Sequence, residues 1–126
     1  MDNKIKVLVL ENDELKEKEI DNDLKSLQNE IGGYIEIPYL SKRLADNGID
    51  LIINEEGKIQ GLEKQLYVID DKGNILDIIC GNCLFVSRNE DGDTIGLSQE
   101  QIDFLKNELG LYLIAQYGML RFIRYN

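Results

Sequence analysis

The chain has 126 residues and a net charge of −10, from 24 acidic and 14 basic side chains. A chain of this length buries about two-thirds of the surface that it exposes when unfolded, so we expect a single domain, residues 1–126, that folds without a metal ion or a disulfide. The negative charge argues against direct binding of nucleic acid or anionic membranes and favours cationic partners. Histidine is absent, which excludes Ser-His and Cys-His nucleophile pairs and histidine-ligated zinc.

The N-terminus lacks a charged segment followed by an apolar one, and no uninterrupted apolar run approaches 18 residues. The sequence therefore predicts neither a signal peptide nor a transmembrane helix, and the expected location is the cytoplasm of a bacterial host.

The N-terminal part predicts two paired strands. Residues 4–10 form a nearly continuous apolar run after Lys6, which is typical of a central strand covered on both faces. Residues 16–20 alternate and predict a second strand, joined to the first by a loop around Asp13. Glu17, Glu19 and Asp21 would then share one face of the second strand.

A helix is predicted next. Apolar residues at 24, 27 and 31 form one helical stripe, Asn22 is a suitable N-cap with Asp23 in the first turn, and Gly32-Gly33 supplies the stop.

Residues 34–40 predict a strand that Pro38 places at a sheet edge. Residues 49–54 predict another strand, followed by a turn in which Gly57 takes a positive φ and by a short returning strand over 58–61. The segment 66–86 is β-rich, with a turn at 71–74.

A second long helix begins at a capping box, Ser98 with Gln101, and buries Ile102, Leu105 and Leu109. The tail, residues 111–126, has 11 apolar residues in 16. Its spacing prolongs the helical stripe and favours a helix, with a β-hairpin as the alternative. The tail either packs on its own domain or forms a homo-oligomer interface through four apolar side chains: Tyr112, Met119, Phe122 and Ile123.

These elements predict an α+β fold: a mixed, mostly antiparallel sheet with two helices packed on it, plus the apolar C-terminal extension.

Four segments, IDNDLKSLQNEIGGYIEI, INEEGKIQGL, DDKGNILDIICGNCLFVS and IGLSQEQIDFL, follow one another in an order that resembles the bacterial and phage family known as domain of unknown function 3846. The resemblance covers residues 4–108 and leaves out the tail. Lys64-Gln65 replaces an Asn-Arg pair that is frequent in the family, so no ligand role is carried onto that loop. The resemblance implies a small accessory protein of phages and conjugative elements, often encoded near antirestriction genes, and by association a counter-defence role.

Cys80 and Cys83 form a Cys-x-x-Cys motif within β-type residues. A redox pair normally opens a helix, and zinc needs four ligands, whereas the chain has no other soft donor. The pair is therefore interpreted as small buried residues beside a bulge at Gly81. Asn82 lies between the two cysteines, and its polar side chain either bonds within its own turn or points into a pocket.

No pair of carboxylates is singled out as acid and base, so we expect no catalytic residues, metal site or cofactor. The expected function is non-catalytic counter-defence, by occupying a host defence protein or sequestering a small signalling nucleotide. A structural or regulatory module of a mobile element is the alternative, and a carboxylate-based enzyme is the third hypothesis. The partner-binding candidates form an acidic ridge: Glu11, Asp13, Glu14, Glu17, Glu19, Asp21 and Asp23. This ridge either binds a cationic partner or only keeps the chain soluble. The candidate ligand pocket contains Arg43, Asn82 and Arg88.

Overall fold

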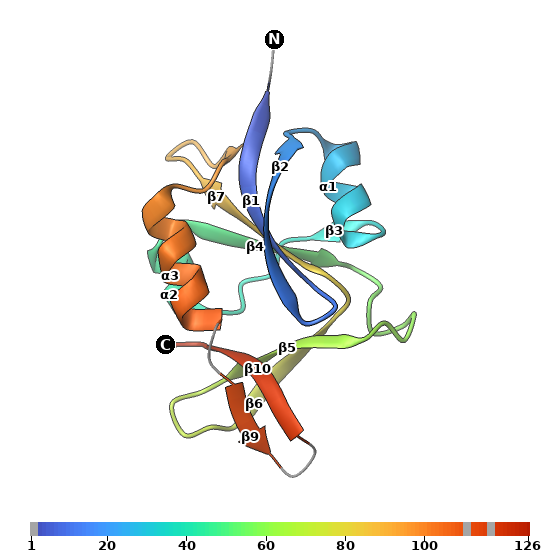
Figure 1. Ribbon diagram of the computed structural model, residues 1–126, viewed down its shortest axis with the longest axis vertical. Helices are drawn as coiled ribbons and strands as arrows, with labels where there is room; N and C mark the ends of the chain where they lie inside the picture. Colours follow the sequence, from blue (N-terminus) through green and yellow to red (C-terminus); the bar gives the residue numbers. More distant parts are fainter. Residues whose placement is uncertain (1–2, 110–111, 116–117) are drawn as a thin grey trace.

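The computed structural model describes residues 3–109, 112–115 and 118–126, and for residues 112–115 and 118–120 it describes the backbone only. Within these residues the chain forms two sheets and three helices (Figure 1). The helices are α1 (Leu24–Ile31), α2 (Lys42–Asp46) and α3 (Gln99–Leu109). The expected α+β class is confirmed, but the strands divide between two sheets, and the five-residue helix α2 was not predicted.

The large sheet is antiparallel throughout, in the order β2-β1-β7-β4-β3, with β8 paired to the end of β7. Its strands are β1 (Lys4–Glu11), β2 (Glu14–Asp21), β3 (Ile35–Glu36), β4 (Ile49–Asn54), β7 (Cys83–Arg88) and β8 (Thr94–Ile95). The prediction that β1 is internal is confirmed, because Val7 and Val9 pack on one face and Leu8 and Leu10 on the other.

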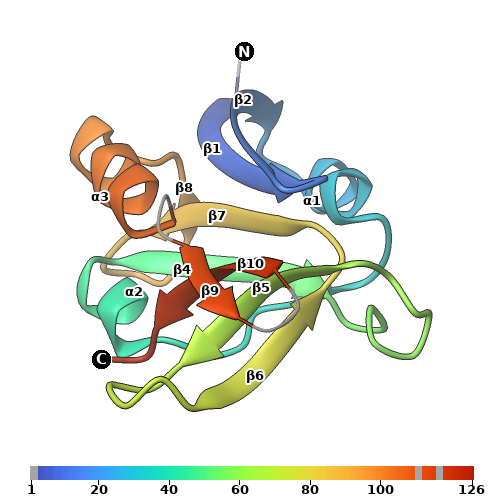
Figure 2. The same cartoon turned by 60° about the horizontal axis from the view of Figure 1, so that its bottom comes forward.

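The small sheet has the order β6-β5-β10-β9, and its strands lie side by side in Figure 2. They are β5 (Lys64–Ile69), β6 (Ile75–Cys80), β9 (Tyr112–Ala115) and β10 (Gly118–Arg124). β5 pairs antiparallel with β6 and parallel with β10. The helix favoured for the tail is therefore wrong, and the alternative hairpin is correct. The tail folds as strands because β10 completes β5, a long-range pairing that its local spacing does not encode.

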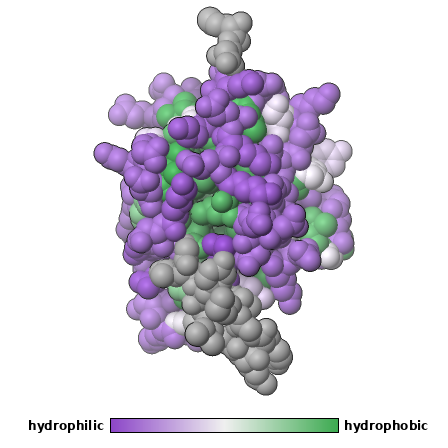
Figure 3. Space-filling view, viewed as in Figure 1, coloured by the Kyte–Doolittle hydropathy of each residue, from purple (hydrophilic) through white to green (hydrophobic). Residues whose placement is uncertain are grey.

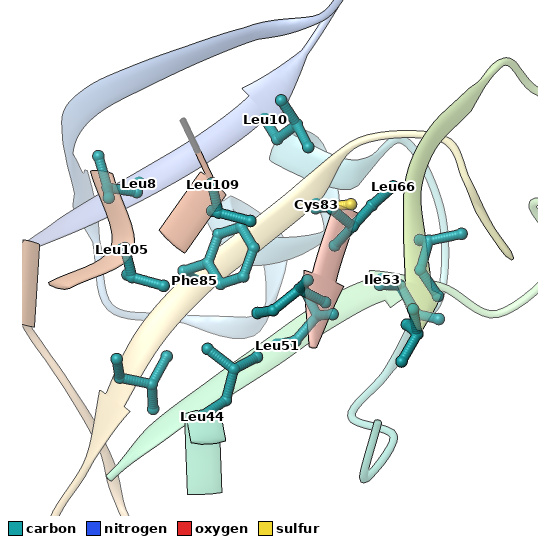
Figure 4. Close-up of a cluster of buried hydrophobic side chains, with 14 of the residues drawn as sticks. Leu8, Leu10, Leu44, Leu51, Ile53, Leu66, Cys83, Phe85, Leu105 and Leu109 are labelled. Carbon is teal, nitrogen blue, oxygen red and sulfur yellow. The ribbon is translucent and has the colours of Figure 1, made fainter. Parts of the chain in front are cut away.

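Two hydrophobic clusters cover the two faces of the large sheet. On one face, α3, α2 and the small sheet enclose a core in which Figure 4 places Phe85 near Leu105 and Leu109 of α3. On the other face α1 packs through Leu27 and Ile31. Helix α1 therefore lies on the opposite side of the large sheet from α2 and α3.

Several local predictions are corrected by the structure. Asp23, not Asn22, is the N-cap of α1, because its carboxylate accepts a hydrogen bond from the Ser26 N–H at 2.7 Å. Leu24 was expected in the buried stripe but is 57 % exposed. Residues 58–61 form turns and not a strand, and Gly57 has no positive φ. Gly57 is needed for a different reason: a Cβ there would lie 2.1 Å from the Cys80 carbonyl oxygen.

Candidate binding surfaces

The acidic residues of β2 divide between the two faces of the strand. Glu17, Glu19 and Asp21 share one face, as predicted, and that face is the one covered by α3, since Lys106 of α3 pairs with Glu17 at 3.1 Å. Glu19 and Asp21 lie opposite Lys6 and Lys4 in the β1–β2 ladder. Each of these three carboxylates therefore has a lysine close by.

Glu11 lies on the other face, where it joins a network beneath α1. Lys18 bridges Glu11, at 3.1 Å, and Glu30, at 3.0 Å, and Lys16 reaches Glu11 at 3.3 Å. The Lys18 ammonium beside it holds the pKa of the Glu11 carboxyl below its ordinary value, and the Glu30 carboxylate raises the pKa of Lys18. Glu11 thus already has cationic partners within the chain.

Asp13 and Asp23 have local structural contacts. Asp23 caps α1, and its bond to Ser26 lowers the pKa of its carboxyl. Asp13, in the turn between β1 and β2, accepts from the Arg121 guanidinium of β10 at 3.4 Å. The structure therefore does not bring the seven predicted carboxylates onto one surface, and Glu14 is the remaining member, exposed beside Lys16 at 3.6 Å.

The three residues of the predicted ligand pocket lie apart. Arg43 of α2 forms a bidentate pair with Glu108 of α3, at 2.5 and 3.1 Å. Arg88, at the far end of β7 from Asn82, bonds to Asp50 of β4. Neither arginine lies beside Asn82, so these three side chains do not form one site.

Asn82 stands in the two-residue turn between β6 and β7. Its amide donates to the Glu30 carbonyl at 3.0 Å, in the last turn of α1, and to the Glu11 carboxylate at 3.4 Å. Carbonyls of the last helical turn have no partner within the helix. Asn82 therefore closes the C-terminal end of α1 onto the large sheet.

The two cysteines stand on different sheets. Cys80 ends β6 and Cys83 begins β7, with Gly81 at φ 93° between them. Cys83 is fully buried, and burial raises the pKa of its thiol, which disfavours the reactive thiolate. Gly81 supports a change of sheet and not the bulge that was expected. Among the described residues, no three cysteine or carboxylate side chains are placed to hold a metal ion.

Two of the predicted interface residues in the tail are part of the core. Phe122 is 9 % exposed and Ile123 is 1 % exposed. Their side chains are thus covered by the chain itself. The side chains of Tyr112 and Met119 lie outside the described residues.

An open apolar edge on the small sheet was not predicted. β6 pairs with β5 alone, and Ile75 and Leu76 of β6 are 49 % and 54 % exposed. They line an outer hollow of about 600 Å³ with Leu62 and Lys64, and a narrower one separates β6 from Glu36 and Pro38. The apolar sequence of residues 75–80 was the available signal, but it equally fits an internal strand.

The model of the family described as domain of unknown function (DUF3846) matches residues 5–110. The chain belongs to this DUF3846 family. No curated protein and no solved structure matches it. The matched range of the DUF3846 domain ends directly after α3, so the β9–β10 hairpin lies outside it. No helix in the described part of the chain is both long and apolar enough to cross a membrane.

Three of the four segments that carry the DUF3846 resemblance converge in the fold. The Gly32-Gly33 end of α1, the loop after β4 and the Gly81-Asn82 turn pack together. A Cβ on Gly33 would lie 2.9 Å from the Asn54 amide, and one on Gly81 would lie 2.9 Å from Leu62. The Gly81 N–H donates to the Glu63 carbonyl at 2.7 Å. This junction is where the chain passes between the two sheets.

Proposed function

We propose that the chain is a non-catalytic protein that binds a cationic partner protein through the open edge of its small sheet. The observation that carries the proposal is β6, an edge strand that combines unpaired backbone groups with exposed large apolar side chains, Ile75 and Leu76. Such an edge is a template for an added strand.

The other edges with described side chains are protected against pairing. β2 alternates lysine with acidic residues along its length, and β3 is two residues long with Pro38 shortly after it. In β6 the one charged residue, Asp77, is paired with Lys58 at 2.6 Å. Charges, prolines and short strands are the usual means of blocking edge-to-edge association. In β6 the single charge is held in an ion pair, the strand has six residues and it contains no proline, which supports a role for this edge in binding.

The surroundings of β6 favour a basic partner segment. Glu36, Glu55 and Asp77 line the narrow hollow beside the strand, with Lys58 as the one cation among the described residues there. Lys58 forms its ion pair with Asp77, and no ion pair joins a described lysine or arginine to Glu36 or Glu55. Ile37 and Tyr39, in the segment directly after β3, are 50 % and 63 % exposed. A segment that alternates apolar and basic residues would place one kind against Ile75 and Leu76 and the other against the carboxylates. The net charge of −10 disfavours a second copy of the chain as the occupant.

The counter-defence setting rests on the family resemblance alone, and the partner would then be a host defence protein. The test is the plating efficiency of phage on bacteria that carry a restriction or CRISPR system and express the chain. We expect expression of the unaltered chain to raise plating. A double variant, Ile75→Lys with Leu76→Lys, should lose this effect because it charges the edge.

The matched control is Leu24→Lys with Tyr34→Lys, which charges two equally exposed hydrophobic residues near α1, at 57 % and 68 % exposure. This control should plate like the unaltered chain. Equal plating by the edge variant and the unaltered chain would place the partner surface elsewhere. No effect of the unaltered chain on any defence system would reject the counter-defence role.

A further inference from the structure

Two adjoining hollows border the outer hollow of β6 at Leu62 and Lys64, and they meet at Gln65 of β5. The first, of about 360 Å³, lies between the end of α1, Leu62 and the Gly81-Asn82 turn. The second, of about 270 Å³, extends toward Tyr67 and Arg121. Asn12, Glu63 and Gln65 line both, so the hollows form one continuous groove beside the β1–β2 turn.

The side-chain amide of Gln65 has a hydrogen-bond partner at its oxygen and none among the described residues at its nitrogen. The side chain is only 8 % exposed, and its Oε1 accepts a hydrogen bond from the Asp13 N–H at 3.1 Å. Because a backbone N–H can only donate, this bond fixes which end of the amide is oxygen. No described residue accepts from Nε2.

The free Nε2 faces the groove. Among the described residues no fully buried side-chain nitrogen or oxygen lacks a hydrogen-bond partner. Nε2 of Gln65 must therefore belong to the small part of this side chain that remains accessible, and the hollows are what Gln65 lines. A buried amide serving structure alone would have both ends bonded. Gln65 instead offers an unused donor in a fixed position.

Asn82 supplies the complementary group. Its Nδ2 is committed to the Glu30 carbonyl and to Glu11, and no described residue donates to its Oδ1. Two side-chain amides therefore line the first hollow, Gln65 with an unused donor and Asn82 with an unused acceptor. Ile31 and Leu62 provide apolar walls in the same hollow, and the Tyr67 ring lines the second.

We propose that this groove binds the base of a nucleoside. The edge of a nucleobase presents a hydrogen-bond acceptor next to a donor, and its flat faces suit apolar and aromatic walls. The hollows exceed what a simple carboxamide would fill. Glu63 lines both of them and Glu11 contacts Asn82, so the first hollow disfavours phosphate groups. In the second hollow, the Arg121 guanidinium is already bonded to Asp13 and to the Leu109 carbonyl. Lys64, the other cation that lines this hollow, stands there with the carboxylates of Asp13 and Glu63.

The test is titration of the purified full-length chain with adenosine, guanosine, cytidine and uridine, and with their 5′-monophosphates, followed by amide chemical shifts and calorimetry. We expect at least one nucleoside to bind, to shift the amides of residues 63–67 and 81–82, and to bind no more weakly as salt is added. The monophosphate should bind no better than the nucleoside.

Gln65→Glu is the diagnostic variant, because it keeps the oxygen that accepts from Asp13 and replaces only the donor. It should weaken nucleoside binding at least tenfold. Gln99→Glu, which adds the same charge at an exposed position of α3 that lines neither hollow, should leave binding within about twofold. If Gln65→Glu fails to fold, Gln60→Trp should block binding by filling the groove from its rim. Failure of all four nucleosides to bind, or undiminished binding by a folded Gln65→Glu, would overturn the proposal.

This groove borders the proposed partner surface but does not include Ile75 or Leu76. The edge variant Ile75→Lys with Leu76→Lys should still bind the nucleoside, and Gln65→Glu should still act like the unaltered chain in plating. Loss of nucleoside binding in the edge variant would contradict the assignment of two separate sites.

Discussion

Asn82 shows how one polar residue can link four elements. Its amide bonds to the Glu30 carbonyl of α1 and to Glu11 of β1, while its backbone joins β6 to β7. Asn82→Ala leaves that carbonyl without its partner, and we expect a loss of about 1 kcal/mol in the free energy of unfolding. Urea denaturation measures this value. Asn29→Ala, on the exposed side of α1, should change it by less than about 0.5 kcal/mol. Equal effects of the two substitutions would show that Asn82 does not cap α1.

The Glu11–Lys18–Glu30 network predicts two pH dependences of opposite sign. The pKa of Glu11 in the folded chain lies below its ordinary value of 4.5, so its stabilisation is complete above pH 4.5 and is lost as the pH falls through the folded pKa. The pKa of Lys18 lies above 10.5, so its stabilisation is present below pH 10.5 and is lost as the pH rises through the folded value.

Lys18→Met removes the effect at Lys18 and weakens the one at Glu11, which Lys16 still supports. We expect a loss of about 1 kcal/mol at pH 7, because the pairs are partly exposed, and a flatter stability curve below pH 4.5 and above pH 10.5. Thermal unfolding across this pH range is the measurement. Lys72→Met, in an exposed turn, should retain the curve of the unaltered chain, and an unchanged curve in Lys18→Met would mean that the network contributes nothing to stability.

At the scale of the element, α3 is held by a reciprocal cap that also ties it to the large sheet. The Gln101 N–H donates to Ser98 Oγ at 3.1 Å, and the Ser98 N–H donates to Gln101 Oε1 at 2.9 Å. Gln101 Nε2 further donates to the Asn47 carbonyl and to Ser87 Oγ, both at 2.9 Å. The capping box that the sequence predicts is therefore confirmed, with an additional tertiary contact.

Two substitutions separate the cap from the tertiary contact. Ser98→Ala should cost about 1 kcal/mol, the usual value of an N-cap. Gln101→Ala should cost more, about 2 kcal/mol, since it also removes the donor to Asn47 and Ser87. Chemical denaturation gives both values, and an exposed position of the same helix, Asp103→Ala, is the control. If Gln101→Ala were no worse than Ser98→Ala, the bonds to the sheet would be dispensable.

Elements with local signals could be predicted from the sequence. The cap at Ser98, the left-handed stop at Gly32 and the alternation of β2 each involve residues within a few positions of one another. The division into two sheets could not, because β6 and β7 are separated by only two residues and resemble a hairpin. The helix favoured for the tail failed for the same reason: only the distant strand β5 selects a strand there.

The same limit applies to the candidate sites. The acidic residues are grouped by their closeness in sequence, whereas the strand alternates between two faces. Lys18, within the same segment, pairs with Glu11, and Arg121 approaches Asp13 from β10. Ile75 is exposed because β6 stands at the edge of its sheet, and the order of the strands in the sheet is not encoded in the local sequence. The sequence assigns Gln65 no ligand role, because the contact that fixes its amide comes from the Asp13 N–H, which is 52 positions away.

At the scale of the whole molecule, the small sheet completes one face of the large one. Its strands β5, β6 and β10 contribute Leu66, Val68, Ile79 and Ile123 to the same cluster as α3. Figure 3 shows the result on one side: a largely hydrophilic face with hydrophobic residues visible mainly in the middle of the view. The tail is part of this arrangement, although the family match ends at residue 110.

Residues of the tail form hydrogen bonds with three separate elements. Tyr125 accepts from the Lys42 N–H at 2.6 Å and donates its own N–H to Ile69 at 2.8 Å, and Ser41 Oγ donates to the Arg124 carbonyl at 2.7 Å. Arg121, 8 % exposed, bonds to Asp13 and to the Leu109 carbonyl. Removing the tail would free the edge of β5 and open the core at Ile123.

We therefore expect a chain that stops after residue 110 to lose cooperative folding, even though it contains the whole family match. Ile123→Ala in the full chain should cost about 2 to 5 kcal/mol, in line with other large-to-small changes at buried positions. Removal of Asn126 alone should cost less than about 1 kcal/mol, since it breaks only a 3.3 Å bond from Arg43. Circular dichroism melts and amide spectra of the three chains are the measurement. A shortened chain that melts cooperatively near the temperature of the full one would show that the tail is an appendage, which these contacts contradict.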